Sequence, residues 1–330
     1  MLHLVGQARW SDEAVLAKVR ELVLPAIERS GPIEAWIVDD TGFAKKGKHS
    51  VGVARQYCGR LGKTDNCQIA VTLSVANHSA SLPIAYRLYL PEIWANDAAR
   101  RGKARVPDEV TFKTKPQIAL EQITAAKTAG VAPGIVLADA GYGSDGEFRA
   151  GLTAMGLKYA VGVQSRAKHL LCRCAQPLAT GHGTAAAKDL ALSLPAEAWR
   201  EVEWREGSID PLTSRFAAVR VRPASRDWKR CEPHLFEWLL VEWPKGEKES
   251  AKYFLSTLPE DVSIEILVDT AKMRWRIERD YEELKCELGL AHFEGRGWRG
   301  FHHHATLCIA AYGFLIRERA DFSPSPNRNR

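Results

Sequence analysis

Hydrophobic and polar positions in the first third of the chain follow patterns typical of one helix and several strands. Residues 11–32 have the spacing of an amphipathic helix, with Ser11 as its N-cap and Gly31-Pro32 as its end. Residues 35–40, Ala-Trp-Ile-Val-Asp-Asp, form a short apolar run typical of a buried strand that reaches the surface at its two acids. Three further β-rich segments predict an antiparallel meander with a turn at 59–66: residues 49–58, 67–77 and 82–91.

The pattern then changes to alternating helices and strands. Residues 92–116 are polar and predict a loop with a basic cluster, and residues 115–130 predict a helix that ends at Gly130. The apolar run that follows ends at Asp139, directly before a glycine-rich turn. The earlier apolar run ends at Asp39 in the same way. A helix near 145–156 and a strand at 157–163 complete a β-β-β-α-β-α-β order, which favours an α/β fold with a mixed sheet flanked by helices.

Beyond residue 164 the pattern becomes mostly strand-like and then helical again. Residues 165–262 alternate or run apolar as strands do, and we interpret them as a β-rich insertion. Residues 263–320 return to helical periodicity, and residues 321–330 predict a disordered basic tail. The 330 residues are therefore expected to form one large domain or two smaller ones.

Composition narrows the class of protein further. The formal net charge is +6, from 46 basic and 40 acidic residues, which permits a polyanionic partner without requiring one. The seven cysteines are irregularly spaced, which favours a reduced, cytoplasmic chain. No run of about 20 apolar residues exists, so no membrane span is expected. The first ten residues lack the pattern of a signal peptide.

The two strand-end acids suggest metal chemistry when they are considered with a third group. Asp39 and Asp139 end apolar runs, and a later helix carries acids at 278, 282, 283 and 287. Carboxylates gathered by an α/β sheet are ligands for Mg²⁺, and two such ions about 3.5–4 Å apart can drive phosphodiester cleavage. The structural alternative is that strands often end in Asp because Asp favours turns.

Residues 274–285, Arg-Trp-Arg-Ile-Glu-Arg-Asp-Tyr-Glu-Glu-Leu-Lys, are both highly charged and regularly patterned. An apolar stripe is predicted to face the core, formed by Ile277, Tyr281, Leu284 and Leu288. In a regular helix Arg274, Glu278 and Lys285 would cluster within about 40° of one another beside that stripe. A metal ligand between two phosphate-binding cations fits this order, whereas a solvated amphipathic helix is the structural alternative.

This stretch resembles the Tyr-x2-Arg-x3-Glu-x6-Lys signature of the DDE transposases of bacterial insertion sequences. Four other segments are similar to the same group and extend the resemblance over nearly the whole chain: residues 39–68, 136–149, 253–259 and 278–315. The resemblance implies an RNase-H-like core over 35–164 and 263–320. It also implies a β-rich insertion between the second Asp and the Glu.

The family's functional residues are carried over one by one. Asp39 matches the first acid, since Thr41 follows it as in the family, and Asp40 is the alternative one position on. Asp139 matches the second acid and Glu278 the third. The resemblance implies that these acids hold two Mg²⁺ ions, with Mn²⁺ as a substitute. Arg274 and Lys285 match the phosphate-contacting bases, whereas the signature Tyr is replaced by Ala271.

Further DNA contacts are expected from two basic segments. Lys45, Lys46 and Lys48 follow Asp39 closely and suit phosphate contacts, although a solvated basic turn is an equal alternative. Trp228 lies among bases that include Arg226, and it could stack on an unpaired DNA base. A core or surface tryptophan is the plainer interpretation of Trp228.

The resemblance implies a transposase that cleaves double-stranded DNA at the terminal inverted repeats of its element and then transfers the strand. Such a protein is expected to act as a homodimer on DNA at the bacterial nucleoid. Only 38 residues precede Asp39, and residues 1–34 look like the remnant of a longer N-terminal helical region in relatives. A truncated, non-mobile remnant that binds DNA without productive transposition is therefore the alternative.

Overall fold

The structure is a computed structural model that describes residues 2–170, 183–205, 212–224, 234–250 and 252–322. The chain divides into two compact units. The first consists of Met1–Gly134 with Trp275–Arg330, and the second of Ile135–Arg274. Both units combine sheet strands with helices, so the predicted α/β class is confirmed, and its mixed sheet and β-rich insertion agree with an RNase-H-like fold.

The first unit is built on four antiparallel strands, of which β2, β3 and β4 form the predicted three-stranded meander. The long strand β3 pairs with each of the other three. The four strands are β1 Ala35–Ala44, β2 Ala54–Cys58, β3 Lys63–Ala76 and β4 Ser81–Leu88. β1 continues four residues beyond its predicted end, because β3 supplies a pairing partner for every residue from Ala35 to Ala44. The two acids of β1 therefore lie in the middle of a strand.

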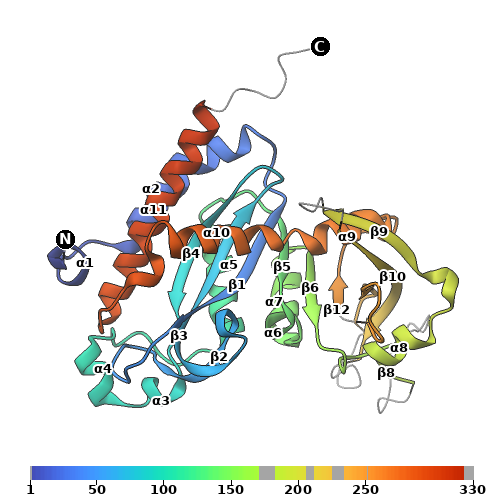
Figure 1. Ribbon diagram of the computed structural model, residues 1–330, viewed down its shortest axis with the longest axis horizontal. Coiled ribbons are helices and arrows are strands. Elements are labelled where there is room, and N and C mark those ends of the chain that lie inside the picture. The colour runs from blue at the N-terminus through green and yellow to red at the C-terminus, as the bar shows by residue number, and fades with distance from the viewer. Residues whose placement is uncertain (1, 171–182, 206–211, 225–233, 251, 323–330) are drawn as a thin grey trace. The chain divides into compact units, whose positions relative to one another are not determined.

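Helices pack around this sheet (Figure 1), and α2 and α11 lie side by side. Ser11 caps α2 as predicted, because its side chain accepts a hydrogen bond from the Ala14 N–H. The predicted polar loop at 92–116 is wrong in part, since it contains two short helices, the second capped by Asp97. The helices of this unit are α1 Leu2–Gly6, α2 Asp12–Glu28, α3 Glu92–Ala95, α4 Ala98–Ala104, α5 Lys115–Thr128, α10 Trp275–Cys286 and α11 Trp298–Phe322.

The second unit contains one parallel strand pair and a series of antiparallel strands. β5 Ile135–Ala138 pairs in parallel with β6 Tyr159–Val163, and β6 pairs on its other side with β12. The remaining strands are β7 Lys168–Leu170, β8 Ala185–Ala186, β9 Arg200–Arg205, β10 Leu212–Pro223, β11 Glu237–Trp243 and β12 Lys252–Ser256. Its helices are α6 Ala140–Gly143, α7 Gly146–Ala154, α8 Ala187–Ser193 and α9 Ile264–Lys272. Most of these strands fall in 165–262, as the predicted β-rich insertion requires.

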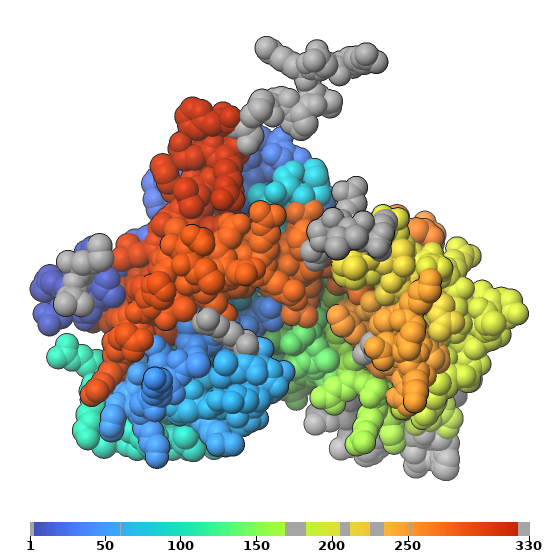
Figure 2. Space-filling view, viewed as in Figure 1, coloured from blue at the N-terminus to red at the C-terminus, as the bar shows by residue number. Residues whose placement is uncertain are grey.

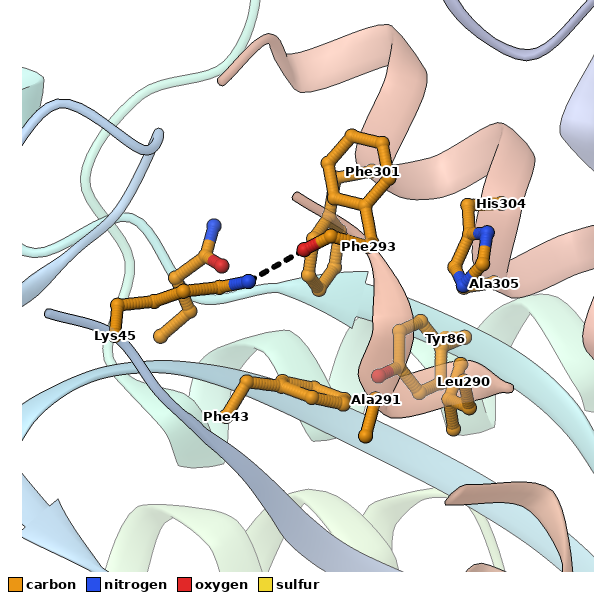
Figure 3. Close-up of a pocket in the computed structure, with 10 residues that line it drawn as sticks. Phe43, Lys45, Tyr86, Leu290, Ala291, Phe293, Phe301, His304 and Ala305 are labelled. Carbon is orange, nitrogen blue, oxygen red and sulfur yellow. Dashed lines mark hydrogen bonds between the residues drawn. The ribbon is translucent and has the colours of Figure 1, made fainter. Parts of the chain in front are cut away.

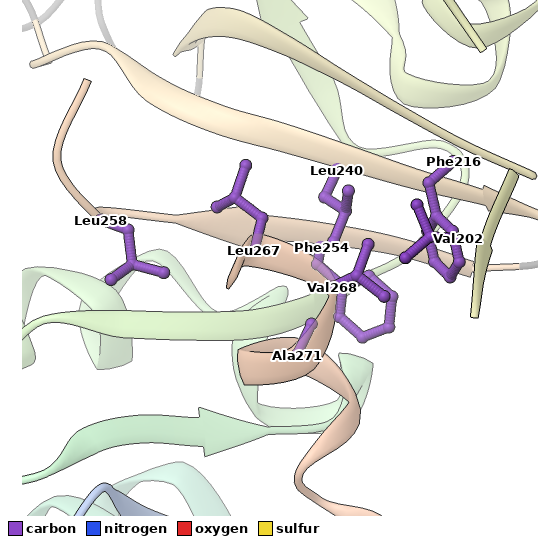
Figure 4. Packing of buried hydrophobic residues seen from close by; sticks show 8 residues of the cluster. All are labelled: Val202, Phe216, Leu240, Phe254, Leu258, Leu267, Val268 and Ala271. Carbon is purple, nitrogen blue, oxygen red and sulfur yellow. The ribbon is translucent and has the colours of Figure 1, made fainter. Parts of the chain in front are cut away.

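The core of the second unit lies where α9 covers the sheet (Figure 4). Leu267, Val268 and Ala271 of α9 pack on apolar side chains of β9 to β12, among them Phe216 and Leu240. Ala271 occupies the position of the family's signature Tyr and is buried in this cluster. A tyrosine added there would have to displace core side chains, so position 271 serves packing in this protein.

One predicted helix is interrupted. We expected a regular helix through 274–285, but α9 ends at Lys272 and α10 begins at Trp275. Arg274 therefore lies in the turn between the two helices, and the helical geometry that placed it beside Glu278 does not apply. Of the predicted apolar stripe, Ile277, Tyr281 and Leu284 are buried within α10, whereas Leu288 lies beyond its end. Across the described ranges, every helix is too short or too polar to span a membrane.

Candidate active site

The two adjacent acids of β1 point to opposite faces of the sheet, as strand geometry requires. Asp40 forms an ion pair with Lys115 at the start of α5. Asp39 is half-buried on the other face, where its ladder partner is Thr72 of β3. The Thr72 hydroxyl donates to the main-chain carbonyl of Asp39 at 3.1 Å, which fixes the backbone at this point.

The face that carries Asp39 is covered by α10. Tyr281 of α10 is buried there, and burial together with the negative charges of Asp39 and Asp280 raises the pKa of Tyr281. Asp39 therefore lies on the sheet face that meets Tyr281 of α10, and Asp40 lies on the face that meets Lys115 of α5. The choice between Asp39 and Asp40 as the first metal ligand stays a prediction.

The hydroxyl oxygen of Thr41 lies on the same face as Asp39. Thr41 lies two residues after Asp39 on β1, so its side chain points to the same side of the sheet. Its hydroxyl oxygen is buried and has no hydrogen-bond partner among the described residues. Buried hydroxyls normally find a partner, so this one is available to a ligand. A carboxylate with a neighbouring hydroxyl is an oxygen donor set that suits a hard divalent cation.

α10 presents Glu278 and Lys285 on nearly the same side. Seven residues separate them, so they lie about 20° apart around the helix axis. Glu278 is exposed, and the Lys285 ammonium lies 5.6 Å from the centre of the Phe43 ring of β1. Phe43 shares the sheet face of Asp39. Figure 2 shows that α10 forms part of the molecular surface on the viewed side.

α10 also holds an acid that the sequence pattern did not identify. Asp280 is 7% exposed and accepts hydrogen bonds from the hydroxyls of Ser81 and Tyr312, the latter at 2.8 Å. Burial raises the pKa of Asp280 to about 6. Its position, three residues after Ile277 and four before Leu284, falls on the apolar stripe, and that spacing was the available signal. Asp280 ties α10 to β4 and α11.

The side chain of Lys45 is largely buried and is not a surface cation. Its ammonium donates to the Phe293 carbonyl, and its side chain is only 9% exposed (Figure 3). It closes one side of a small enclosed space lined by the rings of Phe43, Phe293 and Phe301. This burial argues against the predicted phosphate contact for Lys45, whereas Lys46 and Lys48 are exposed.

In the second unit, Asp139 lies directly after β5, as predicted. Its side chain caps α6, because Oδ1 accepts a hydrogen bond from the Gly141 N–H at 2.8 Å. Its main-chain carbonyl accepts from the Gly143 N–H, also at 2.8 Å. The side chain remains half-buried. One carboxylate oxygen is thus held by the backbone, and the direction of the whole group is fixed.

The turn after Asp139 depends on glycine because α6 lies almost against β6. A Cβ atom at Gly143 would come within 2.1 Å of the Gly162 carbonyl oxygen, and one at Gly162 within 2.9 Å of the Ala140 nitrogen. Neither distance is tolerated, so both positions require glycine. Arg149 of α7 is buried and donates to the Gly143 carbonyl, which supports the same turn from the other side.

Two further predicted DNA contacts, Trp228 and Arg226, lie outside the described residues. His302 of α11 accepts from the Leu88 N–H, and its other ring nitrogen contacts the Trp298 carbonyl, so it packs the helix onto β4. Within the described parts of the chain, no group of three or more His, Cys, Asp or Glu side chains is arranged to hold a metal ion.

Comparison with known families decides the class of protein. A family model described as DDE superfamily endonuclease matches residues 1–211. The chain belongs to the DDE superfamily endonucleases. The matched region contains β1 with Asp39 and β5 with the following Asp139, the two strands that the sequence singled out. DDE endonucleases generally use divalent metal ions, in agreement with the oxygen donors found on these strands.

Among individual proteins, the probable transposase for insertion sequence element IS701 from Microchaete diplosiphon is 33% identical over 164 residues. The alignment covers 49% of this chain and 40% of that protein, so the chain matches less than half of the relative's length. Among solved structures, the NurA nuclease from Sulfolobus solfataricus aligns with 86% of this chain and 95% of its own. Its sequence identity is 7% and its TM-score 0.25.

Proposed function

We propose that this protein is an insertion-sequence DDE transposase that cleaves DNA at the ends of its element and joins the freed end to a target. The family match carries the proposal. The position of Asp39 on the sheet face below α10, the helix of Glu278 and Lys285, supports it. The similarity to an insertion-sequence transposase favours transposition over other uses of a DDE endonuclease.

The metal-holding residues in this proposal are Asp39, Asp139 and Glu278. All three offer carboxylate oxygens, and Thr41 adds an unpartnered hydroxyl near Asp39. When bound, two Mg²⁺ ions, or Mn²⁺ in their place, supply Lewis-acid activation of the attacking oxygen and stabilise the leaving oxygen. Oxygen-only ligands suit these ions better than softer metals.

In this proposal, cationic side chains contact the DNA phosphates, and hydrogen bonds within the fold position the acids. The Lys285 ammonium lies over the Phe43 ring and is assigned a contact with a DNA phosphate beside Glu278. Arg274 directly precedes α10 and is assigned a second phosphate contact. Asp280 positions α10 through its bonds to Ser81 and Tyr312. The cap of α6 orients Asp139 before substrate arrives.

The proposed substrate is double-stranded DNA that carries the element's terminal inverted repeats, bound by a homodimer on the bacterial nucleoid. Paired repeats at the two ends of an element suit a two-fold symmetric protein. The competing hypothesis is a protein that binds DNA without productive transposition. It predicts DNA binding with no strand cleavage under any metal condition.

A cleavage assay with the full chain and its flanking terminal repeats distinguishes the two hypotheses. We expect nicking and strand transfer in Mg²⁺ or Mn²⁺, and binding without cleavage in Ca²⁺. Full activity in EDTA would rule out the metal mechanism. Binding with no cleavage in Mg²⁺ or Mn²⁺ would favour the DNA-binding hypothesis.

A further inference from the structure

A polar groove in the second unit begins at the residue after Asp139. Its volume is about 590 Å³, within the range of roughly 300–1,000 Å³ typical of ligand pockets. Ala140, which directly follows Asp139 in the chain, is one of its lining residues. The polar residues of the lining are Gln164, Ser165, Arg166, Lys188, Glu249, Ser250 and Tyr253.

The walls of the groove are fixed to one another by hydrogen bonds. The Gln164 N–H donates to the Ser144 hydroxyl at 3.1 Å, which joins the end of β6 to the end of α6. The Lys188 N–H donates to the Ser165 carbonyl at 3.0 Å, which joins α8 to the same turn. On the β12 side, Tyr253 is the ladder partner of Val163. The groove therefore holds a constant position relative to Asp139 within this unit.

The charges in the groove are arranged around one ion pair. The Lys188 ammonium lies 2.6 Å from a carboxylate oxygen of Glu249, so a lysine of α8 is held by the segment before β12. Arg166 is exposed, and within the described ranges it has no carboxylate partner. Removing Glu249 would leave a groove with two cations and no anion.

We infer that this groove binds the phosphate backbone of the DNA strand that runs past Asp139, with Arg166 and Lys188 as its phosphate contacts. Glu249 occupies the place of a phosphate on Lys188 until DNA displaces it. The inference rests on the proposed function, because a strand cleaved at Asp139 carries further phosphates along the adjoining surface. Such grooves combine cations that follow the backbone with neutral polar groups, as this lining does.

The test measures DNA binding by the full chain in Ca²⁺, with a duplex oligonucleotide of arbitrary sequence over a series of salt concentrations. The double variant Arg166→Ala/Lys188→Ala should bind roughly tenfold more weakly, with a salt slope lower by about 1 for each lost cation. Lys158→Ala is the matched control, because Lys158 is exposed at the opposite end of β6. An unchanged affinity and slope in the double variant, equal to the control, would overturn the inference.

Glu249→Gln provides a second, opposite signature. Loss of the carboxylate frees Lys188 for phosphate, so affinity should rise about three- to tenfold. Glu197→Gln is its control, since Glu197 is exposed and does not line the groove. Weaker binding by Glu249→Gln would contradict the inference. Thermal unfolding of each variant checks that the fold is intact.

Cleavage measured in parallel separates this inference from the proposed function. If the wild type cleaves DNA in Mg²⁺ and the groove variants bind DNA normally, the proposed function holds and the inference about the groove is wrong. If the groove variants bind DNA more weakly but the wild type does not cleave it, the inference about the groove holds and the proposed transposase activity is contradicted.

Discussion

β1 and β5 follow the same sequence pattern, an apolar run that leads to an acid, yet the two acids have different structural roles. Asp139 comes after the last residue of β5 and caps α6 with one carboxylate oxygen. Asp39 lies in the middle of β1, and the residues before and after it in the strand also pair with β3. One acid is part of a strand-to-helix turn, and the other lies within a continuous strand.

This difference shows which of the two acids the fold alone can explain. Asp is a preferred N-cap residue, so stability is a sufficient reason for Asp139. Asp is depleted in strands, and the half-buried Asp39 faces a buried tyrosine whose pKa its charge helps to raise. Strand propensity therefore gives no reason for an acid at position 39, whereas the N-cap preference gives one at position 139.

The largest expected effect is on DNA cleavage. Asp39→Asn and Asp139→Asn should each lower the cleavage rate on the order of a thousandfold, because a lost metal ligand removes several kcal/mol of transition-state stabilisation. The measurement is single-turnover cleavage of a terminal-repeat duplex. Asp40→Asn is the matched control, because Asp40 pairs with Lys115 on the opposite face. A larger loss in Asp40→Asn than in Asp39→Asn would reverse the assignment.

The second expected effect is on stability and separates the two acids. Asp139→Ala should lower the free energy of unfolding by about 1 kcal/mol, because α6 loses its cap, whereas Asp139→Asn should retain most of it. Asp39→Ala should cost less than Asp139→Ala, since it caps no helix. Denaturant unfolding measures all three variants. If Asp39→Ala and Asp139→Ala lower the free energy of unfolding equally, the capping role of Asp139 would not distinguish the two acids.

A third effect concerns β6, the strand that pairs with β5 just before Asp139. Glu237 of β11 is buried and accepts a hydrogen bond from the Tyr159 hydroxyl of β6 at 2.8 Å. Burial raises the pKa of Glu237 above 4.5. The folded state then binds more protons than the unfolded state between pH 4.5 and the raised value, so this group makes stability fall as pH rises through that window.

Glu237→Gln should remove this part of the pH dependence. The wild type should lose stability relative to the variant as pH increases from about 4.5. Unfolding at a series of pH values gives the comparison. A difference between wild type and variant that stays constant with pH would show that Glu237 does not titrate as its burial implies.

The smallest expected effect concerns the segments that follow the two strands. β1 leads into a loop with exposed Lys46 and Lys48, whereas β5 leads into an uncharged helix. Lys46→Ala/Lys48→Ala should weaken DNA binding a few-fold and lower the salt slope by about 2. Lys45→Ala should instead lower stability, because its ammonium is buried against Phe293. Equal effects on binding from Lys45 and Lys46 would contradict this division.

Sequence patterns predicted the elements that depend on local periodicity and capping. The Ser11 cap, the four antiparallel strands and the strand that leads to Asp139 all follow from short-range rules. The break at Arg274 did not, because residues 264–285 have good helical periodicity throughout and tertiary packing divides them between two units. The burial of Asp280 and Lys45 was also missed, since both depend on partners far away in the sequence.

The choice between Asp39 and Asp40 illustrates what a pattern omits. Adjacent strand residues alternate faces, but the sequence does not say which face meets which helix. The folded chain places Lys115 on the side of Asp40 and Tyr281 on the side of Asp39. The resemblance favours Asp39 through Thr41 and leaves Asp40 as the alternative, so cleavage by the two variants decides between them.

The first unit is discontinuous, and this has a consequence for protein synthesis. The ribosome delivers β1 early, but α10 and α11, which complete this unit, emerge only after the whole second unit has been made. Domains generally fold as units during translation, so the second unit can fold first, while the sheet around Asp39 waits for its covering helices. The sheet that carries Asp39 would then gain its covering helices only after the second unit has been synthesised.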